Sequence, residues 1–477
     1  MMATHTLTML HIVVRQQWRI MARDGRLRWL LLALLLVFAA SLTAAAGRAN
    51  LTLAQQQRDA VSEAEVWAAQ GEANPHGAAH FGRYVYKPWP PLAVLDPGLL
   101  NHLGSTLRLE GHVQNTGRYK PTDRGFALSR FDGLNPAAVL QTLVPLLIVF
   151  AAFTTFSGTR SRALLAQELG AGASSRLLAA GRFAAFAVGL GRLALATGVL
   201  CAVWLGARGD WPLFGSLLLM LGACYVYWLV FLALVMAISA HAENAGASLL
   251  RSLGLWAVVV VLLPMLAPQL AEQRYPTPGA TAFHKAVERE VMEGPDGHDT
   301  RDVRLGRLEA ETLKAYGVQK IADLPINFDG LVFEHGEQRT TGIYTRHFAQ
   351  LYDDHAAQAR FSLAASVLSP MLALRPLSAA LAQSDLPAHR HFLEQAERYR
   401  YAMVQALNRD MKLHRKGNGL YTADVNAITA GIQFAPQSLA MRDVAPRIVQ
   451  PLLILLAWLI AALLLLWRSA SQLGGKA

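Results

Sequence analysis

WPLFGSLLLMLGACYVYWLVFLALVMAIS, residues 211–239, decides the fold, because this stretch contains no Asp, Glu, Lys or Arg. A helix of about 20 apolar residues crosses the roughly 30 Å of hydrocarbon in a bilayer, so the stretch predicts a membrane span. Comparable apolar blocks lie on both sides of it. Together they predict about six transmembrane helices, at residues 27–46, 136–157, 183–205, 211–239, 249–270 and 448–467.

The composition agrees with an all-α integral membrane protein. Of the 477 residues, 53% are hydrophobic and 16% are charged, whereas soluble domains are about 25% charged. The net charge is +11, but no basic stretch carries interleaved aromatic residues. We therefore expect membrane lipids as partners and no nucleic acid. Cys201 and Cys224 lie inside apolar blocks, so the long polar segments must fold without disulfides.

Basic residues orient the predicted helices. They lie on one side if six helices alternate, and they are Arg15, Arg19, Arg23, Arg26, Arg28, Arg160, Arg162, Arg176, Arg182, Arg251, Arg468 and Lys476. The positive-inside rule makes that side cytoplasmic. We expect a multi-pass protein of the bacterial inner membrane, with the N-terminus and the tail at 468–477 inside. Residues 47–135 and 271–447 then lie outside, and five or seven spans would break this pattern.

Residues 1–26 predict an amphipathic elbow helix on the cytoplasmic surface. Apolar residues, Trp18 among them, recur every three or four positions over residues 9–21. Basic residues form a stripe at every fourth position: Arg15, Arg19 and Arg23. Such a helix lies in the headgroup plane with its arginines toward the phosphates. The alternatives are a plain basic flank and, for the block that follows, a signal peptide with a cleavage site at residues 44–46.

The cytoplasmic loop at residues 158–182 has a recognisable local pattern. Residues 161–169 can form a short helix that Gly170 and Gly172 end, and Ser174 is a good N-cap for the helix that follows. The residues alone leave two interpretations open. The short helix inserts into a cleft of a partner, or the loop is an ordinary turn back into the membrane.

The two long outer segments are expected to pack together as one mainly helical domain. Residues 52–70 continue the first membrane helix, and the proline-rich residues 84–91 are expected to be irregular. Helical spacing covers residues 284–292, 305–316 and 392–413, and the apolar residues 362–374 predict a further helix. The domain receives a periplasmic partner, gates substrate exit, or only braces the spans.

The histidines do not form a pattern typical of metal binding. His389 and His391 are two apart and do not share a helix face. His76 and His80 are four apart, but the flanking Asn-Pro and Gly are not helical context. A metal site needs three or four converging ligands. We therefore expect no metal, no cofactor and no catalytic residue.

Arg192 is the best candidate for a functional polar residue inside a span. It follows Gly189 and Gly191, where small residues allow close helix packing. An arginine at this depth faces a partner helix or a polar cavity, or it snorkels to the surface if the boundary of the span shifts.

Several short motifs occur along the chain in the order in which a known family carries them. They are the run at residues 16–29 with Arg23-Asp24-Gly25-Arg26, then Leu95-Asp96-Pro97-Gly98 and Leu109-Glu110-Gly111-His112, then Ser369-Pro370, Arg375-Pro376-Leu377-Ser378, His389–Leu393 and Ala406–Asn408. With the layout of the spans, they resemble ABC-2 type transporter permeases, in a subfamily with a large outer insert of unknown function (DUF3526-like). The sequence departs from that pattern at residues 159–163, where relatives carry a Glu-x-Glu-x-Gly-Thr-Leu-like run, whereas residues 172–182 match.

The resemblance implies a permease subunit that exports a substrate while a separate ATPase subunit hydrolyses ATP. The sequence contains no Gly-x-x-x-x-Gly-Lys-Ser/Thr loop, so we expect no enzymatic activity of its own. The permease would pair with itself or with a similar subunit, and the departure at 159–163 fits the less engaged half of a heterodimer. ATPase coupling is implied for the elbow helix and for loop residues, which are Arg160, Arg162, Glu168, Gly172 and Arg176.

Two other classes of protein are weighed against a permease. A cell-envelope sensor or scaffold would bind a ligand or partner through the outer domain, but the sequence shows no cytoplasmic catalytic or adaptor domain. A membrane enzyme would cluster polar residues at one depth, and the spans show no such cluster. The substrate cannot be read from these residues.

Overall fold

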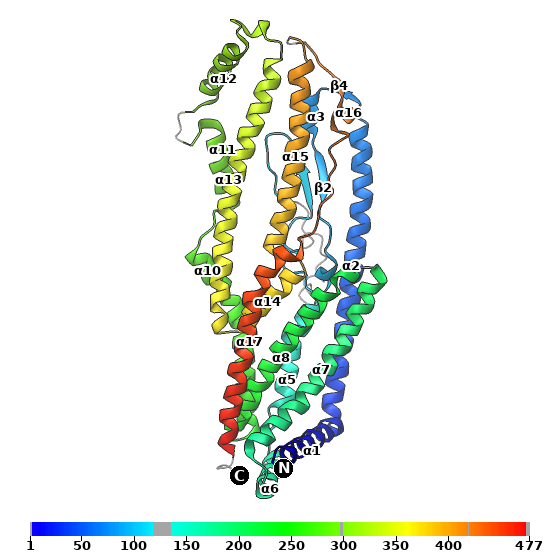
Figure 1. Cartoon of the computed structure of the whole chain (residues 1–477), viewed down its shortest axis with the longest axis vertical. Coiled ribbons are helices and arrows are strands. Elements are labelled where there is room, and N and C mark those ends of the chain that lie inside the picture. The colour runs from blue at the N-terminus through cyan, green and yellow to red at the C-terminus, as the bar shows by residue number, and fades with distance from the viewer. Residues whose placement is uncertain (1, 118–134, 296–298, 418, 474–477) are drawn as a thin grey trace.

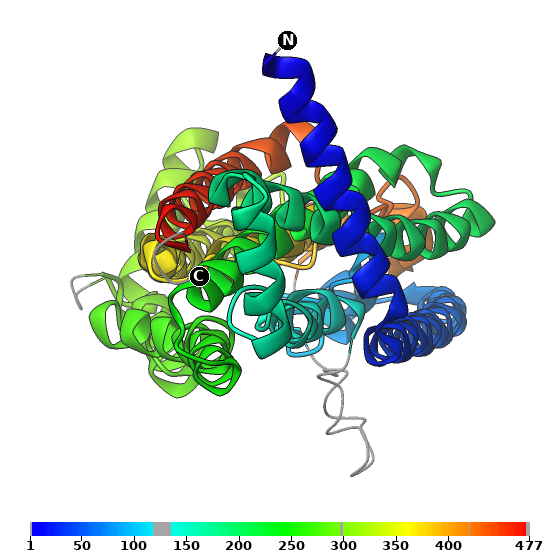
Figure 2. The same ribbon diagram turned by 90° about the horizontal axis from the view of Figure 1, so that it is seen from below.

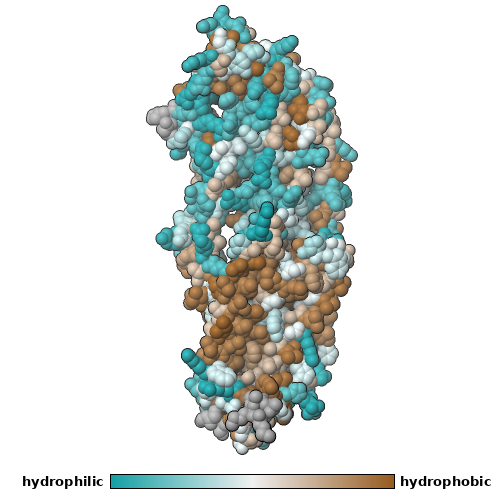
Figure 3. Space-filling view, in the orientation of Figure 1, coloured by the Kyte–Doolittle hydropathy of each residue, from teal (hydrophilic) through white to brown (hydrophobic). Residues whose placement is uncertain are grey.

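The computed structural model describes residues 2–117, 135–295, 299–417 and 419–473, without the side chains of residues 2–6 and 26. Of the predicted basic residues, Lys476 and the side chain of Arg26 lie outside this description. The molecule is elongated (Figure 1). One half has an apolar surface and the other a polar surface (Figure 3). We call them the apolar half, which holds both chain ends, and the polar half.

Within the described residues, five helices are long and apolar enough to cross a membrane. Four of them are α2 (Gly25–Ala68), α7 (Ser175–Arg208), α8 (Phe214–His241) and α17 (Met441–Ser471). The fifth is a continuous helix that consists of α9 (Ala245–Trp256), a π-helical segment (Ala257–Leu262) and α10 (Leu263–Arg274). Each contains one predicted span, if the short 3-10 turn Trp211–Leu213 is counted with α8, and each extends beyond it. The first helix continues into the polar half, as expected for residues 52–70.

The remaining predicted span, residues 136–157, forms a shorter helix. It consists of α4 (Pro136–Ala138), a π-helical segment (Val139–Leu143) and α5 (Val144–Ala152). At 1.5 Å per residue it is about 25 Å long, less than the usual hydrocarbon thickness. Both chain ends nevertheless lie at the same end of the molecule (Figure 1). The chain therefore runs along the apolar half an even number of times, and this shorter helix supplies one of the passes.

Helix α8 is the buried centre of the apolar half, and aromatic side chains tie it to the shorter helix. A π-helical turn breaks the regular hydrogen-bond ladder. Here the carbonyl groups of residues 140–142 accept hydrogen bonds from Trp228 Nε1, Tyr227 Oη and Trp256 Nε1, at 2.8, 3.2 and 3.1 Å respectively. Trp228 and Tyr227 are fully buried. The irregular segment thus keeps partners where water does not reach it.

The polar half is built mainly from helices of the second long segment. These are α11 (Ala280–Glu293), α12 (Arg301–Tyr316), α13 (Phe328–Ala364), α14 (Met371–Leu381), α15 (Leu386–His414) and α16 (Val425–Thr429). The helices predicted at 284–292, 305–316 and 392–413 lie inside α11, α12 and α15. The apolar stretch 362–374 is not one helix. It breaks after Ala364 and resumes at Met371, because Ser369-Pro370 interrupts it.

The chain is mainly helical, as predicted, but within the described residues the polar half also contains two small antiparallel sheets. Strand β2 (Arg83–Tyr86) pairs with β3 (Thr106–Leu109), and β1 (Glu72–Ala73) pairs with β4 (Ala423–Asp424). Part of the stretch predicted to be irregular, 84–91, is therefore a strand. Its alternation brings Val85, Leu107 and Leu109 onto the face of α15. The β1–β4 pair joins the two long segments, which pack together.

We predict that Trp228→Phe lowers the free energy of unfolding by about 1–3 kcal/mol, because it leaves a buried carbonyl without its donor. Thermal unfolding of the protein purified in detergent measures the effect. The matched control is Trp29→Phe, since Trp29 is 71% exposed, and it should change stability by less than about 0.5 kcal/mol. Equal stability of the two variants would contradict the role given to the Trp228 hydrogen bond.

Candidate functional site

The N-terminal helix α1 (Met2–Arg23) lies across the end of the helices in the apolar half (Figure 2). Two glycines of α7 create the room for it. A Cβ atom at Gly181 would come within 2.6 Å of the Val13 side chain, and one at Gly189 would touch Trp18 and Met21 at 3.5 Å. Small residues thus let the two helices approach closely. The amphipathic helix predicted at residues 9–21 is present.

The side chains of α1 divide as the pattern predicts. Val13 is buried against α7. The predicted basic stripe is exposed, and its members are Arg15, Arg19 and Arg23. An exposed stripe beside an apolar contact face is the arrangement that suits a headgroup layer.

Arg192 and Trp18, predicted separately, meet in the structure. The guanidinium carbon of Arg192 lies 4.1 Å from the centre of the Trp18 ring, a cation–π contact. Arg192 is exposed on α7. Arg192 therefore contacts α1 and does not face a polar cavity between spans. The contact holds α1 against α7.

The predicted loop 158–182 folds as its local pattern indicates. Helix α6 (Thr159–Gly170) covers the predicted short helix, and Gly172 follows with a φ of +87°. Ser174 Oγ then accepts a hydrogen bond from the backbone N–H of Leu177 at 3.3 Å and starts α7. The N-cap and the glycine stop therefore set the helix–turn–helix shape.

A buried ion pair locks α6 onto α7. Arg182 Nη2 donates to Glu168 Oε2 at 2.6 Å, and the two side chains are 3% and 15% exposed. Arg182 Nη1 also donates to the Thr155 carbonyl at 2.7 Å, so the guanidinium has partners on both sides. Sequence reasoning took Arg182 for a simple basic flank. Only its proximity to Glu168, fourteen residues earlier in the chain, identifies it as a positioning residue.

The other predicted coupling residues fall into two groups. Arg162 donates to the Ala242 carbonyl at 2.8 Å, where α8 ends, and Arg176 lies 5.0 Å from the Trp467 ring on α17. These contacts hold α6 and the start of α7 against neighbouring helices. Arg160 and Gly172 are exposed, and so is Arg176. They are thus the members of the predicted set that a partner protein could reach most directly.

A cavity of about 830 Å³ lies where the apolar half meets the polar half. Its charged lining residues are Asp96, Arg360, Arg375, Asp385, Arg390 and Arg447. Asp96 is buried, which raises its pKa, and it accepts hydrogen bonds from Ser378 Oγ and the Gly98 N–H. Arg447 pairs with Asp385. Arg360 and Arg375 form no ion pair within the described part of the chain. The lining is therefore net positive.

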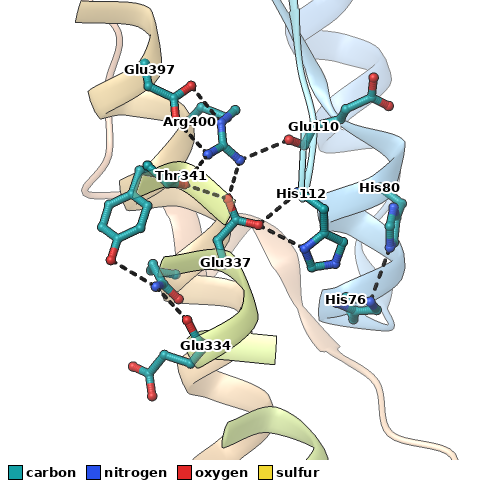
Figure 4. Close-up of polar contacts among 11 residues, drawn as sticks. His76, His80, Glu110, His112, Glu334, Glu337, Thr341, Glu397 and Arg400 are labelled. Atoms are coloured by element: carbon teal, nitrogen blue, oxygen red, sulfur yellow. Dashed lines mark hydrogen bonds and ion pairs between the residues drawn. The ribbon is translucent and has the colours of Figure 1, made fainter. Parts of the chain in front are cut away.

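The structure also overturns the reason for expecting no metal. His76 and His80 share one face of a short helix, α3 (Pro75–Phe81). Asn74 caps that helix by accepting from the Gly77 N–H at 2.9 Å, with Pro75 at its first position. The Asn-Pro pair was thus a helix start signal. His112, more than thirty residues later, lies beside both (Figure 4).

Comparison with known proteins gives one match. Residues 280–429 match the family described as "Domain of unknown function (DUF3526)". The matched range holds α11 to α16 and leaves the apolar helices outside it. No curated protein and no solved structure matches the chain.

We predict that Glu168→Ala lowers the free energy of unfolding by about 3–5 kcal/mol, because Arg182 stays buried without its carboxylate. Thermal unfolding in detergent measures this. Glu243→Ala removes a comparable pair with Arg251 in which the side chains are 66% and 50% exposed, and it should cost no more than about 1 kcal/mol. Similar losses in both variants would show that the Glu168 pair does not fasten α6.

Proposed function

We propose that the chain is the membrane-spanning permease subunit of an ABC transporter in the bacterial inner membrane. It would export its substrate with ATP hydrolysed by a separate subunit. The match at residues 280–429 supports this, because the DUF3526 domain is associated with ABC-2 type permease proteins. The order of motifs over the rest of the chain resembles the same permeases.

The observation that carries the proposal is the joined unit of α6, α7 and α1 at one end of the molecule. The Glu168–Arg182 pair fastens α6 to α7, and the Arg192–Trp18 contact fastens α1 to α7. A force applied to α6 would therefore act on a long apolar helix and on the elbow together. Transport driven by a separate ATPase requires an element of this kind, which moves between two positions when the ATPase subunit binds or hydrolyses nucleotide.

The exposed basic residues of this end orient the protein in the proposal. The stripe on α1, together with Arg160 and Arg176, is exposed at the end that holds both chain ends. Under the positive-inside rule this end is cytoplasmic, where an ATPase subunit binds, and the polar half is extracytoplasmic. The permease would pair with itself or with a similar subunit.

The cavity between the two halves is the proposed place for substrate on its way out. Its lining combines apolar side chains, among them Leu363, Met371 and Ala380, with charged side chains that are net positive. The surroundings of Arg360 and Arg375 favour a substrate with an anionic group attached to an apolar body. The alternative, a sensor or scaffold of the cell envelope, would use the polar half for binding without moving anything.

We predict that the chain, purified gently from native membranes, brings with it a soluble subunit that carries a phosphate-binding loop and hydrolyses ATP. Arg160→Glu should reduce that hydrolysis at least about tenfold without unfolding the permease. Loss of an interfacial charge contact costs about 1.4 kcal/mol or more, which weakens binding of the ATPase subunit about tenfold. Mass spectrometry and an ATPase assay make the measurement.

The control is Arg251→Glu, which changes an exposed arginine at the same end but outside α6. Hydrolysis that survives Arg160→Glu unchanged would move the coupling away from α6. If no ATPase is recovered in several detergents, the permease proposal fails and the sensor or scaffold takes its place.

A further inference from the structure

Three imidazoles converge in the polar half, outside the cavity and the α6 unit. The ligand atoms of His76, His80 and His112 all lie within 4.8 Å of one another. The Nε2 atoms of His76 and His80 are 3.2 Å apart. A zinc ion in tetrahedral coordination holds two imidazole nitrogens about 3.3 Å apart, because each Zn–N bond is about 2.0–2.1 Å. The first pair is thus already at the separation that such an ion requires.

His112 is brought to the other two by an unusual backbone conformation. Its φ is 65°, a left-handed conformation that non-glycine residues seldom adopt. The preceding Gly111 N–H donates to the Ala79 carbonyl of α3 at 2.8 Å, which places the turn directly on the helix that carries the other histidines. Strained backbone of this kind persists where the surroundings hold it in place, and it concentrates at functional sites.

A buried carboxylate orients His112. Glu337 Oε2 accepts from the backbone N–H of His112 at 2.8 Å and lies 3.1 Å from its Nδ1 (Figure 4). This contact leaves the Nε2 atom of His112 as the available ligand. A carboxylate that holds the second nitrogen of a histidine is the usual outer shell of a histidine metal ligand.

Glu337 is itself held firmly and is not a ligand. Burial raises the pKa of Glu337, but the hydrogen bond from His112 and the nearby Arg400 guanidinium outweigh burial and lower that pKa to about 2. Arg400 Nη1 donates to Glu337 Oε1 at 2.5 Å, and the two side chains are 2% and 0% exposed. One turn before Glu337 on α13, Phe333 stacks on the His76 ring at 3.7 Å. Helix α13 thus orients two of the three histidines.

We propose that His76, His80 and His112 bind one divalent transition-metal ion of the borderline class that imidazole ligates, such as Zn²⁺ or Cu²⁺. Neutral imidazole suits these ions, while Cu⁺ prefers sulfur ligands and Mg²⁺ or Ca²⁺ prefers oxygen ligands. His80 is exposed and His112 is about one-third exposed, so the ion reaches the site from solvent and keeps a coordination position for an exchangeable ligand.

The electrostatics agree with neutral ligands. Burial, then the neighbouring His112 and His80, lower the pKa of His76 to about 4. The imidazole of His76 is therefore uncharged near neutral pH and available to a cation. The site rests on the polar half alone, so it stands or falls independently of the proposed transport function.

The test uses the full chain, purified without a histidine tag and stripped with a chelator. Zn²⁺ is titrated by calorimetry, and Cu²⁺ is followed by electron paramagnetic resonance for hyperfine coupling to nitrogen. We expect saturable binding of one ion per chain and a higher temperature of unfolding with Zn²⁺. His80→Ala and His112→Ala should abolish this binding, and Glu337→Gln should weaken it about 10- to 100-fold.

His80→Ala is the decisive variant, because its exposed side chain can be removed without disturbing the Glu337–Arg400 pair. The matched control is His414→Ala, which breaks another histidine–carboxylate pair, with Asp410, at an exposed position. It should leave binding unchanged. Absence of saturable binding to the unsubstituted chain, or binding that survives His80→Ala, would overturn the proposal.

Discussion

Backbone groups buried away from water must find partners within the protein, and the apolar half is organised by that constraint. The π-helical turn at residues 139–143 departs from the regular ladder, and side chains of α8 and the α9–α10 run supply donors to three of its carbonyls. The shorter helix is thereby held against the buried centre of the bundle. Its outer end also lines the cavity, so the same constraint positions the proposed path of the substrate.

Two buried ion pairs perform comparable tasks at opposite ends of the molecule. Glu168–Arg182 joins α6 to α7, and Glu337–Arg400 joins α13 to α15 while it orients His112. Taking such charges out of water costs free energy, and replacement by apolar side chains is often neutral or stabilising. Their value here is in geometry. Each pair fixes the relative position of segments that would otherwise meet only through apolar contact.

Local signals in the sequence predicted much of the fold. The apolar blocks, the spacing of residues 9–21 and the cap at Ser174 all act within a few residues, and each appears in the structure. The pairing of β2 with β3 was missed, because it depends on contacts between separated strands. The histidine cluster was missed for a similar reason. His112 is distant in sequence, and the Asn-Pro before His76 starts a helix instead of preventing one.

The transport proposal places the polar half outside the cell and α6 inside it, so the sidedness of the chain is its most direct test. Green fluorescent protein or alkaline phosphatase can be fused after residue 477, and alkaline phosphatase can be inserted after residue 295, between α11 and α12. The account predicts a fluorescent C-terminal fusion, an inactive C-terminal phosphatase and an active internal phosphatase. An active phosphatase at the C-terminus, with a silent insertion after residue 295, would contradict it.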